Sequence, residues 1–208
     1  SSQETTKVDS FGSNFSADVM VSDQQKIIIC REKLTQFTFS KILKDETADT
    51  LQCAILDMIL DFVPTSGSTI QVDASTSFQY LADNKDSNLF KNNIVIDVGR
   101  VHNPNKNPIA ENAIKEFRKE RLRLDPRGGQ ISEADRAIIT RNMNSRIRDR
   151  GLSAKEMFIR RGQVSHENIT VVDKTLSERQ FSNRKLFNDK HNQQLPDNLH
   201  VFSVGDRV

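Results

Sequence analysis

FSADVMV at residues 15–21 decides the fold, because its apolar and polar residues alternate as they do in a half-buried strand. The apolar members of this stretch share one face: Phe15, Ala17, Val19 and Val21. Asp18 therefore lies on the opposite face, although aspartate is depleted in strands and prefers caps and turns. A carboxylate in this setting indicates a role other than packing.

Two further strands follow this one after short polar connections. The first predicted strand covers residues 14–21, and KIIICRE at residues 26–32 predicts a second, mostly buried strand. TQFTFSKIL at residues 35–43 predicts a third, in which Phe37 and Phe39 alternate with polar residues. Three strands with short connections predict an antiparallel meander.

Helical and strand patterns alternate after the meander. Helices are expected at residues 46–63, 77–82, 108–124, 132–149 and 153–161, and strands at TIQVD, 69–73, and NNIVIDVG, 92–99. The strand at 92–99 is apolar on both faces, which favours a central or well-covered position. The order predicts an α/β fold in which a mixed sheet, the meander plus parallel strands, is flanked by helices.

The last two long helices have clear start signals and apolar sides. Asn107 can cap the helix that begins at Pro108, and Ser132 can cap the next one. The apolar side of the first helix consists of Ala110, Ala113, Ile114 and Phe117. The second is a basic amphipathic helix whose apolar residues include Ala134, Ala137, Ile138 and Ile147.

Composition bounds the class of protein. The chain has 208 residues, 36% of them hydrophobic, a mean hydropathy of −0.57, and no apolar stretch near the roughly 20 residues that a membrane span needs. Cys30 and Cys53 both lie in apolar surroundings, which favours buried thiols over a disulfide. Nothing in the composition indicates secretion, and no histidine and cysteine pair has zinc-ligand spacing.

Charge is unevenly distributed along the chain. Residues 1–117 carry 11 Lys and Arg against 16 Asp and Glu, whereas residues 118–161 carry 13 against 6. A basic segment beside an acidic one is expected of a nucleic-acid-binding protein that also holds metal ions. A solvated helical face is the alternative interpretation of the same charges.

Three carboxylates are the candidates for a metal site. In the predicted topology the first strand lies centrally beside the strand that ends at Asp73, and adjacent strands are about 4.8 Å apart. Asp18 and Asp73 could therefore reach one cation, and Glu111, in the first turn of a later helix, could dock over them. Such oxygen ligands suit Mg²⁺ or Mn²⁺, and two such ions would activate a water or a 3′-hydroxyl for phosphoryl transfer. Asp97 is a rival ligand, because it too interrupts an apolar strand.

The helix that carries Glu111 also carries cations on the same face. At about 100° per residue, Lys115 and Arg118 lie within about 40° of Glu111, and Lys119 lies beside them. These cations could hold DNA phosphates next to the metal ions. The alternative is an ordinary Glu–Lys pair four residues apart on a surface helix.

Three motifs carry a resemblance to a known family. They are FSADVM, residues 15–20, TIQVDASTSFQ, residues 69–79, and NPNKNPIAENAIKEFRKE, residues 103–120. With these motifs the chain resembles the catalytic core of an LTR-retrotransposon integrase, within the group of retroviral integrases and DDE transposases. GLSAKEMFIRRGQ at 151–163 and VFSVGDRV at 201–208 are similar to the segments that follow such cores, so the resemblance covers roughly residues 11–208.

The resemblance implies an RNase H-like fold and a catalytic role for three residues. Asp18, Asp73 and Glu111 would bind two Mg²⁺ or Mn²⁺ ions, and Lys115, Arg118 and Lys119 would contact DNA. The enzyme would process the 3′ ends of element cDNA and join them to target duplex DNA. It would act as a homo-oligomer in the nucleus after a cytoplasmic phase in a nucleoprotein particle, with no small-molecule substrate.

Two other functions fit the same residues. One is a related DDE transposase or RNase H-type nuclease, and the other is a host-retained, non-catalytic DNA-binding protein derived from an integrase. The expected organisation is a polar N-terminal linker, a catalytic core, a basic helical extension that completes it, a linker and the start of a β module. Their boundaries are 1–13, 14–126, 127–161, 162–198 and 199–208.

Overall fold

The computed structural model describes residues 10–99, 107–147 and 151–170, together with Asp173, Thr175, Leu176, Glu178, Ser182 and Leu186. Residues 1–9 of the expected N-terminal linker lie outside the described residues, as do 100–106 and the whole expected β module at 199–208. In the described part of the chain, no helix combines the length and the hydrophobicity needed to cross a membrane.

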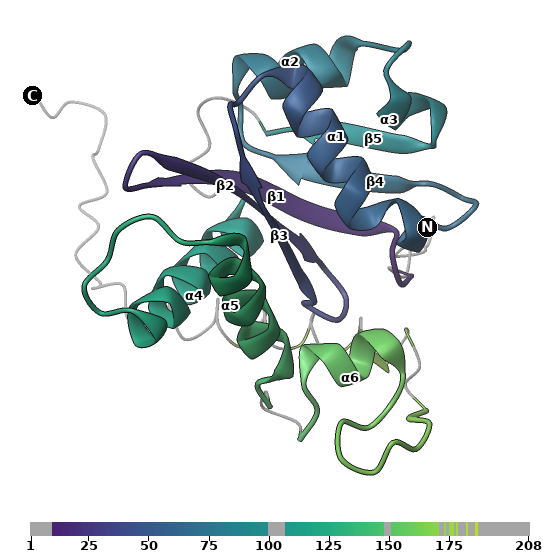
Figure 1. The fold of residues 1–208 in the computed structure, drawn as a ribbon. Coiled ribbons are helices and arrows are strands. Elements are labelled where there is room, and N and C mark those ends of the chain that lie inside the picture. The colour runs from purple at the N-terminus through teal and green to yellow at the C-terminus, as the bar shows by residue number, and fades with distance from the viewer. Residues whose placement is uncertain are drawn as a thin grey trace, which may run out of the picture.

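A five-stranded mixed sheet forms the centre of the protein (Figure 1). Its strands are β1 (Asn14–Ser22), β2 (Gln25–Glu32), β3 (Thr38–Leu43), β4 (Ser68–Val72) and β5 (Ile94–Val98), in the spatial order β3-β2-β1-β4-β5. β1, β2 and β3 pair antiparallel, and β4 is parallel to both β1 and β5. The predicted meander and the central place of the first strand are therefore confirmed.

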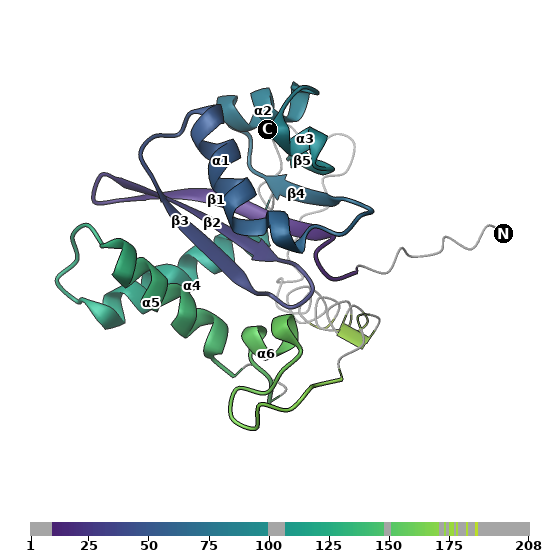
Figure 2. The same ribbon diagram turned by 45° about the vertical axis from the view of Figure 1, so that its right-hand side comes forward.

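Helices cover both faces of the sheet (Figures 1 and 2). α1 (Ala48–Ile59), a short 3₁₀ turn (Leu60–Phe62), α2 (Thr76–Asp83) and α3 (Asn88–Lys91) lie on one side, and α4 (Pro108–Leu124) and α5 (Glu133–Ser145) lie on the other. α6 (Ala154–Ile159) follows at the bottom of the view. α4 has the predicted bounds, whereas α3 lies where the sequence predicted no helix. Ser87 caps α3 by accepting a hydrogen bond from the amide of Phe90.

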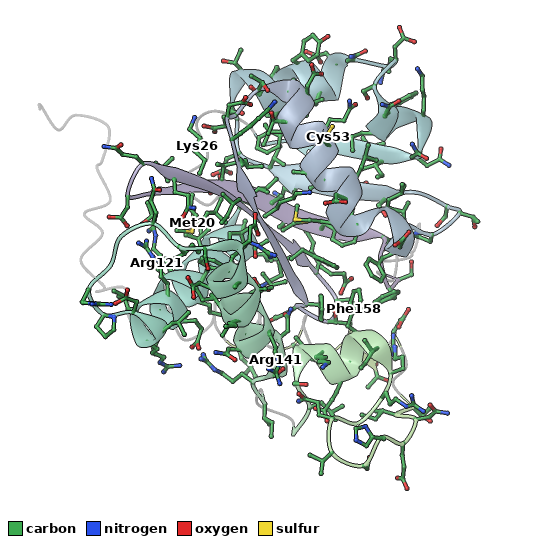
Figure 3. The ribbon with its side chains drawn as sticks, in the orientation of Figure 1. Met20, Lys26, Cys53, Arg121, Arg141 and Phe158 are labelled. Carbon is green, nitrogen blue, oxygen red and sulfur yellow. The ribbon has the colours of Figure 1, made fainter. Side chains whose placement is uncertain are left out.

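Side chains on the two faces of β1 pack into two separate hydrophobic cores. Phe15 and Ala17 are fully buried in the core under α1 and α2, as the sequence pattern predicts. Met20, on the opposite face, packs with Ala113 and Phe117 of α4 and with Ile139 of α5 (Figure 3). Both faces of the strand are therefore needed for the fold, and Asp18 lies on the face that α4 covers.

β5 corrects the expectation for residues 92–99, because it is an edge strand and not a central one. Ile94 and Ile96 are buried in the core under α2, but Val95 is 48% exposed and Asp97 is exposed as well. A short run of apolar residues on both faces of a strand indicates that the strand is buried, but it does not say which strands lie beside it. Because β4 pairs with both β1 and β5, β5 is left at the edge of the sheet.

α5 is rotated relative to the expected orientation, and it ends at Ser145 instead of 149. Its buried residues are Ile139, Met143 and Asn144, whereas the residues expected on the apolar side are exposed: Ala134, Ala137, Ile138 and Ile147. Asn144 exchanges hydrogen bonds with the backbone of Thr38 at 2.8 Å and 2.7 Å. These bonds satisfy the free edge of β3 and set the rotation of the helix, which apolar spacing alone does not reveal.

The cysteines are both free thiols, but only one of them is buried. Cys30 is fully buried, as predicted, whereas Cys53 on α1 is exposed (Figure 3). Cys53 lies two positions before Ile55, or about 200° around the helix from the buried side of α1. Cys53 therefore lies on the exposed side of α1, although apolar residues nearby in sequence are buried. The prediction of a second buried thiol was wrong.

An aromatic cluster attaches the C-terminal segment to the sheet. Phe158 of α6 stacks on Phe37 at 4.1 Å between ring centroids, and its ring meets those of Phe11 and Phe62 edge-on at 4.9 Å. Arg160 also pairs with Asp173, whose other oxygen accepts a hydrogen bond from the Phe11 amide. The described positions from Asp173 to Leu186 are helical, although the pattern of 162–198 predicted a linker. Long-range contacts of this kind leave no periodic trace in the sequence.

Phe158→Ala should lower the free energy of unfolding by about 3 kcal/mol, because a ring that is 8% exposed leaves a cavity between α6 and β3. Urea unfolding followed by circular dichroism measures the change. Tyr80→Ala is the control, since the Tyr80 side chain is 58% exposed and its removal should cost less than about 0.5 kcal/mol. Equal effects of the two substitutions would contradict this assignment of the cluster.

Candidate metal centre

The candidate metal centre consists of Asp18, Asp73 and Glu111. The register of two parallel strands positions the first two. Ala17 of β1 pairs with Val72 of β4, so Asp18 and Asp73 are the next residues on neighbouring strands. Because side chains alternate along a strand, both carboxylates lie on the α4 face of the sheet, opposite the core that holds Ala17 and Val72. Neighbouring strands are about 4.8 Å apart, so the backbone at Asp18 lies one strand spacing from the backbone at Asp73.

Asn107 holds the first turn of α4 against these two strands. Its side chain is fully buried, and its Nδ2 donates hydrogen bonds to the carbonyl oxygens of Ala17 at 3.0 Å and Gln71 at 3.2 Å. Its Oδ1 accepts from the amide of Ala110 at 3.4 Å, which is the helix cap expected from the sequence. Its backbone oxygen accepts from the amide of Glu111 at 3.0 Å. Glu111 is thus one helical turn from a residue bonded to both strands.

The rest of α4 is anchored along its length. Arg31 of β2 is 2% exposed and makes a two-pronged ion pair with Glu116 at 3.2 Å and 2.8 Å. Arg121, near the other end of the helix, bonds to Ser22 at the end of β1 and to Asp23 in the turn that follows. These polar anchors, together with the buried apolar side of α4, fix which way its exposed face points.

Asp18 has an altered proton affinity because of its surroundings. Burial raises the pKa of Asp18 to about 6, against the lowering effect of a hydrogen bond from the Val19 amide at 2.8 Å. The negative charges of Asp73 and Glu111 raise that pKa further. The three carboxylates predicted as a set therefore interact electrostatically in the folded protein.

Glu46 is a fourth acidic residue that acts on Asp18, and sequence reasoning assigned it only to the start of a helix. Its negative charge also raises the pKa of Asp18. Lys26 of β2 pairs with Glu46 at 2.9 Å, and Ser77 of α2 donates a hydrogen bond to its backbone oxygen at 2.6 Å. Glu46 directly precedes Thr47, the cap of α1. A position at a helix start explains an acidic residue locally, so the sequence contains no sign that Glu46 acts on Asp18.

The donor set suits a hard divalent cation, and one oxygen has no other partner. Asp73 Oδ1 is buried and has no hydrogen-bond partner among the residues that the structure describes. A buried carboxylate oxygen without a partner is costly unless a cation or a donor meets it. No group of three or more His, Cys, Asp or Glu side chains within the described ranges is arranged to hold a metal ion. Asp18, Asp73 and Glu111 thus form an electrostatic cluster that a cation would have to draw together.

Cations follow Glu111 along the exposed face of α4. Lys115 is 70% exposed, and its Nζ lies 3.9 Å from Glu111 Oε2, which is the surface pair considered as the alternative for these residues. Arg118 and Lys119 are exposed on the same helix. Asp97, the rival ligand, lies on β5, where it pairs in register with Gln71 of β4. It is therefore one strand further from β1 than Asp73 is.

Comparison with solved structures identifies the fold. The chain matches the catalytic core domain of BIV integrase with a TM-score of 0.55 and 16% sequence identity, over 71% of this chain and 94% of that one. The predicted fold class, an RNase H-like mixed sheet flanked by helices, is thereby confirmed. No family model and no curated protein matches the sequence.

Asp18→Asn should stabilise the metal-free protein at neutral pH. The folded-state pKa of Asp18, about 6, exceeds its unfolded value of about 3.9, so the ionised carboxylate destabilises the fold above pH 6. This cost declines as the pH falls through 6 and disappears below 4. After a discount for solvent screening, the gain should be about 1–2 kcal/mol at pH 7.5 and close to zero at pH 4. Urea unfolding with a chelator at both pH values measures it, and an equal gain at both would contradict the electrostatic explanation.

Proposed function

We propose that the chain is the catalytic core of a retroelement integrase, a metal-dependent polynucleotidyl transferase. One observation carries the proposal: Asp18 and Asp73 directly follow Ala17 and Val72, which pair in register on parallel strands, and Asn107 bonds the start of the Glu111 helix to the same strands. The likeness to the BIV integrase core supplies the fold, and the function rests on these residues. The activity would be 3′-end processing followed by transfer of the new 3′ ends into target DNA.

The three carboxylates would divide the work of holding two ions. Asp18 and Asp73 would share one Mg²⁺ or Mn²⁺, and Asp18 and Glu111 would hold the other. When bound, such ions lower the pKa of a nucleophilic water or 3′-hydroxyl and stabilise the leaving oxygen of a phosphodiester. Asp18 is central to both sites, and protons should compete with metal there as the pH falls towards 6. Glu111 lies in the first turn of α4, at the positive end of the helix dipole.

The exposed cations of α4 would hold the DNA. Lys115, Arg118 and Lys119 are all exposed and continue along the helix from Glu111. Bound to backbone phosphates, they would set the position of the duplex relative to the carboxylates without reading its sequence. In this role Lys115 would exchange its pairing with Glu111 for a phosphate, while Glu111 turns towards the ions.

The biological setting belongs to the same proposal. Substrates would be duplex ends of the element's cDNA and target DNA, and the protein would act as a homo-oligomer in the nucleus. The resemblance of three motifs to LTR-retrotransposon integrases supports this lineage.

A non-catalytic DNA-binding protein is the second candidate, favoured because no group of three or more acidic, His or Cys side chains among the described residues could hold a metal ion. The two functions make different demands on metal, because only the enzyme needs it to act on DNA. Mn²⁺-dependent nicking or joining of duplex oligonucleotides supports the enzyme, and DNA binding without it supports the second candidate. Cleavage restricted to RNA–DNA hybrids would instead indicate an RNase H-type nuclease.

Glu111→Gln should reduce Mn²⁺-dependent joining of duplex oligonucleotides by about a hundredfold or more. The amide keeps the size of the side chain but loses the charge that holds one ion, and an ion contributes several kcal/mol to the transition state. Labelled oligonucleotides resolved on denaturing gels measure the joined product.

Glu133→Gln is the matched control, because Glu133 also lies in the first turn of a helix but belongs to α5. It should leave joining within about twofold of the unaltered protein, as expected of an exposed substitution away from the centre. Undiminished joining by the Glu111 variant would contradict the role of this carboxylate.

Replacing Lys115 and Arg118 together by Ala should weaken DNA binding and reduce its salt dependence. Each lost phosphate contact should lower the slope of log K against log salt by about 0.9. Fluorescence anisotropy with a labelled duplex at several salt concentrations measures both effects. Arg141→Ala, on the exposed side of α5 (Figure 3), is the control and should leave the slope unchanged. Equal slopes for the double variant and the unaltered protein would exclude α4 as the DNA-binding face.

A further inference from the structure

We propose that Asn107 is a positioning residue that sets the distance of Glu111 from Asp18 and Asp73. The inference rests on the proposed function, because it concerns the geometry of the same centre. Asn107 connects three elements. Its side chain bonds to β1 and to β4 near the end of their pairing, and it caps the start of α4. A residue that served only as a helix cap would need no contact with the strands.

The hydrogen-bonding groups of Asn107 are all used, and each has a different target. An asparagine amide has two N–H donors and one carbonyl acceptor. Nδ2 donates to Ala17 O and Gln71 O, and Oδ1 accepts from the Ala110 amide. The side chain is fully buried, so water does not compete for these bonds.

The two strand carbonyls belong to residues next to the candidate ligands. Ala17 immediately precedes Asp18, and Gln71 lies two positions before Asp73. On the helix side, the backbone oxygen of Asn107 accepts from the amide of Glu111 at 3.0 Å. Asn107 therefore bonds to the two strands through its side chain and to the amide of Glu111 through its backbone oxygen. Any shift of the helix turn relative to the strands must break a bond that Asn107 makes.

Other capping residues cannot replace this arrangement. Serine caps a helix about as well as asparagine, but it is shorter and has a single O–H donor. Aspartate has the same shape and caps equally well, but an ionised carboxylate has no donor for the two carbonyls. Substitution can thus separate the capping role of residue 107 from its bonds to the two strands.

Loss of the Asn107 bonds should move the first turn of α4 without detaching the helix. Arg31 holds Glu116 in the middle of α4, and Arg121 holds the far end to the β1–β2 turn. These anchors leave the fold in place while Glu111, next to the lost bonds, gains freedom. Residues that orient metal ligands in this way commonly affect metal affinity by about 10- to 100-fold.

The test compares Asn107→Ser with Ser132→Ala in the full chain. Ser132 caps α5 and accepts from the Asp135 amide at 3.1 Å, so its loss removes a helix cap away from the centre. Free Mn²⁺ is followed by electron paramagnetic resonance during titration, and thermal unfolding is recorded for each variant. Carbon-13 shifts of the Ala17 and Gln71 carbonyls in the metal-free protein report directly on the two bonds from Nδ2.

Asn107→Ser should weaken Mn²⁺ binding at least tenfold and shift both carbonyl signals, whereas Ser132→Ala should bind Mn²⁺ within twofold of the unaltered protein. Equal Mn²⁺ affinity in all three proteins would overturn the inference and leave Asn107 as a cap. If the unaltered protein binds no Mn²⁺, the proposed function fails and this inference fails with it. That result is distinguishable, because the carbonyl shifts would still respond to the substitution.

Asn107→Asp is the second variant, to be used if Asn107→Ser does not fold. It keeps the cap and the shape, and it replaces the two donors with a negatively charged acceptor. Both carbonyl signals should shift, and nicking of duplex DNA at saturating Mn²⁺ should fall at least tenfold. An unchanged nicking rate with shifted carbonyl signals would overturn the inference.

Discussion

The parallel pairing of β1 with β4 is the constraint on which the candidate centre depends. This pairing sets Ala17 opposite Val72 and so makes Asp18 and Asp73 neighbours on one face of the sheet. A slip by one residue would turn one carboxylate into the core under α1, because side chains alternate between faces. The fully buried Phe15 and Ile70, also paired in register, hold the strands against such a slip.

The carboxylates of the candidate centre repel one another, and polar contacts of α4 with the sheet keep Glu111 close to Asp18 despite this repulsion. Asp18 is both partly buried and close to other carboxylates, which raises its pKa to about 6. Glu111 is kept nearby because α4 is bonded to the sheet through Asn107, Arg31 and Arg121. Strain of this kind is expected where a cation, and not the protein alone, completes the interaction.

Sequence reasoning succeeded where one local pattern had only one physical solution. The cap and the initial proline of α4 defined its start, and the alternation of residues 14–21 defined both faces of β1. It failed where several tertiary arrangements satisfy the same pattern. Val95 is apolar and yet exposed at a sheet edge, Ile138 gives way to Ile139 on the buried side of α5, and Cys53 faces away from the core.

The chain's residues by themselves determined the elements and the candidate carboxylates, because periodicity, caps and a misplaced aspartate are local properties. Tertiary structure alone decided which groups meet: Asn107 with the carbonyls of two strands, and Glu46 with the field around Asp18. The two bonds from Asn107 join residues 36 and 90 positions apart in the chain. No local pattern encodes them, since they arise only when burial has closed the long loops between the segments.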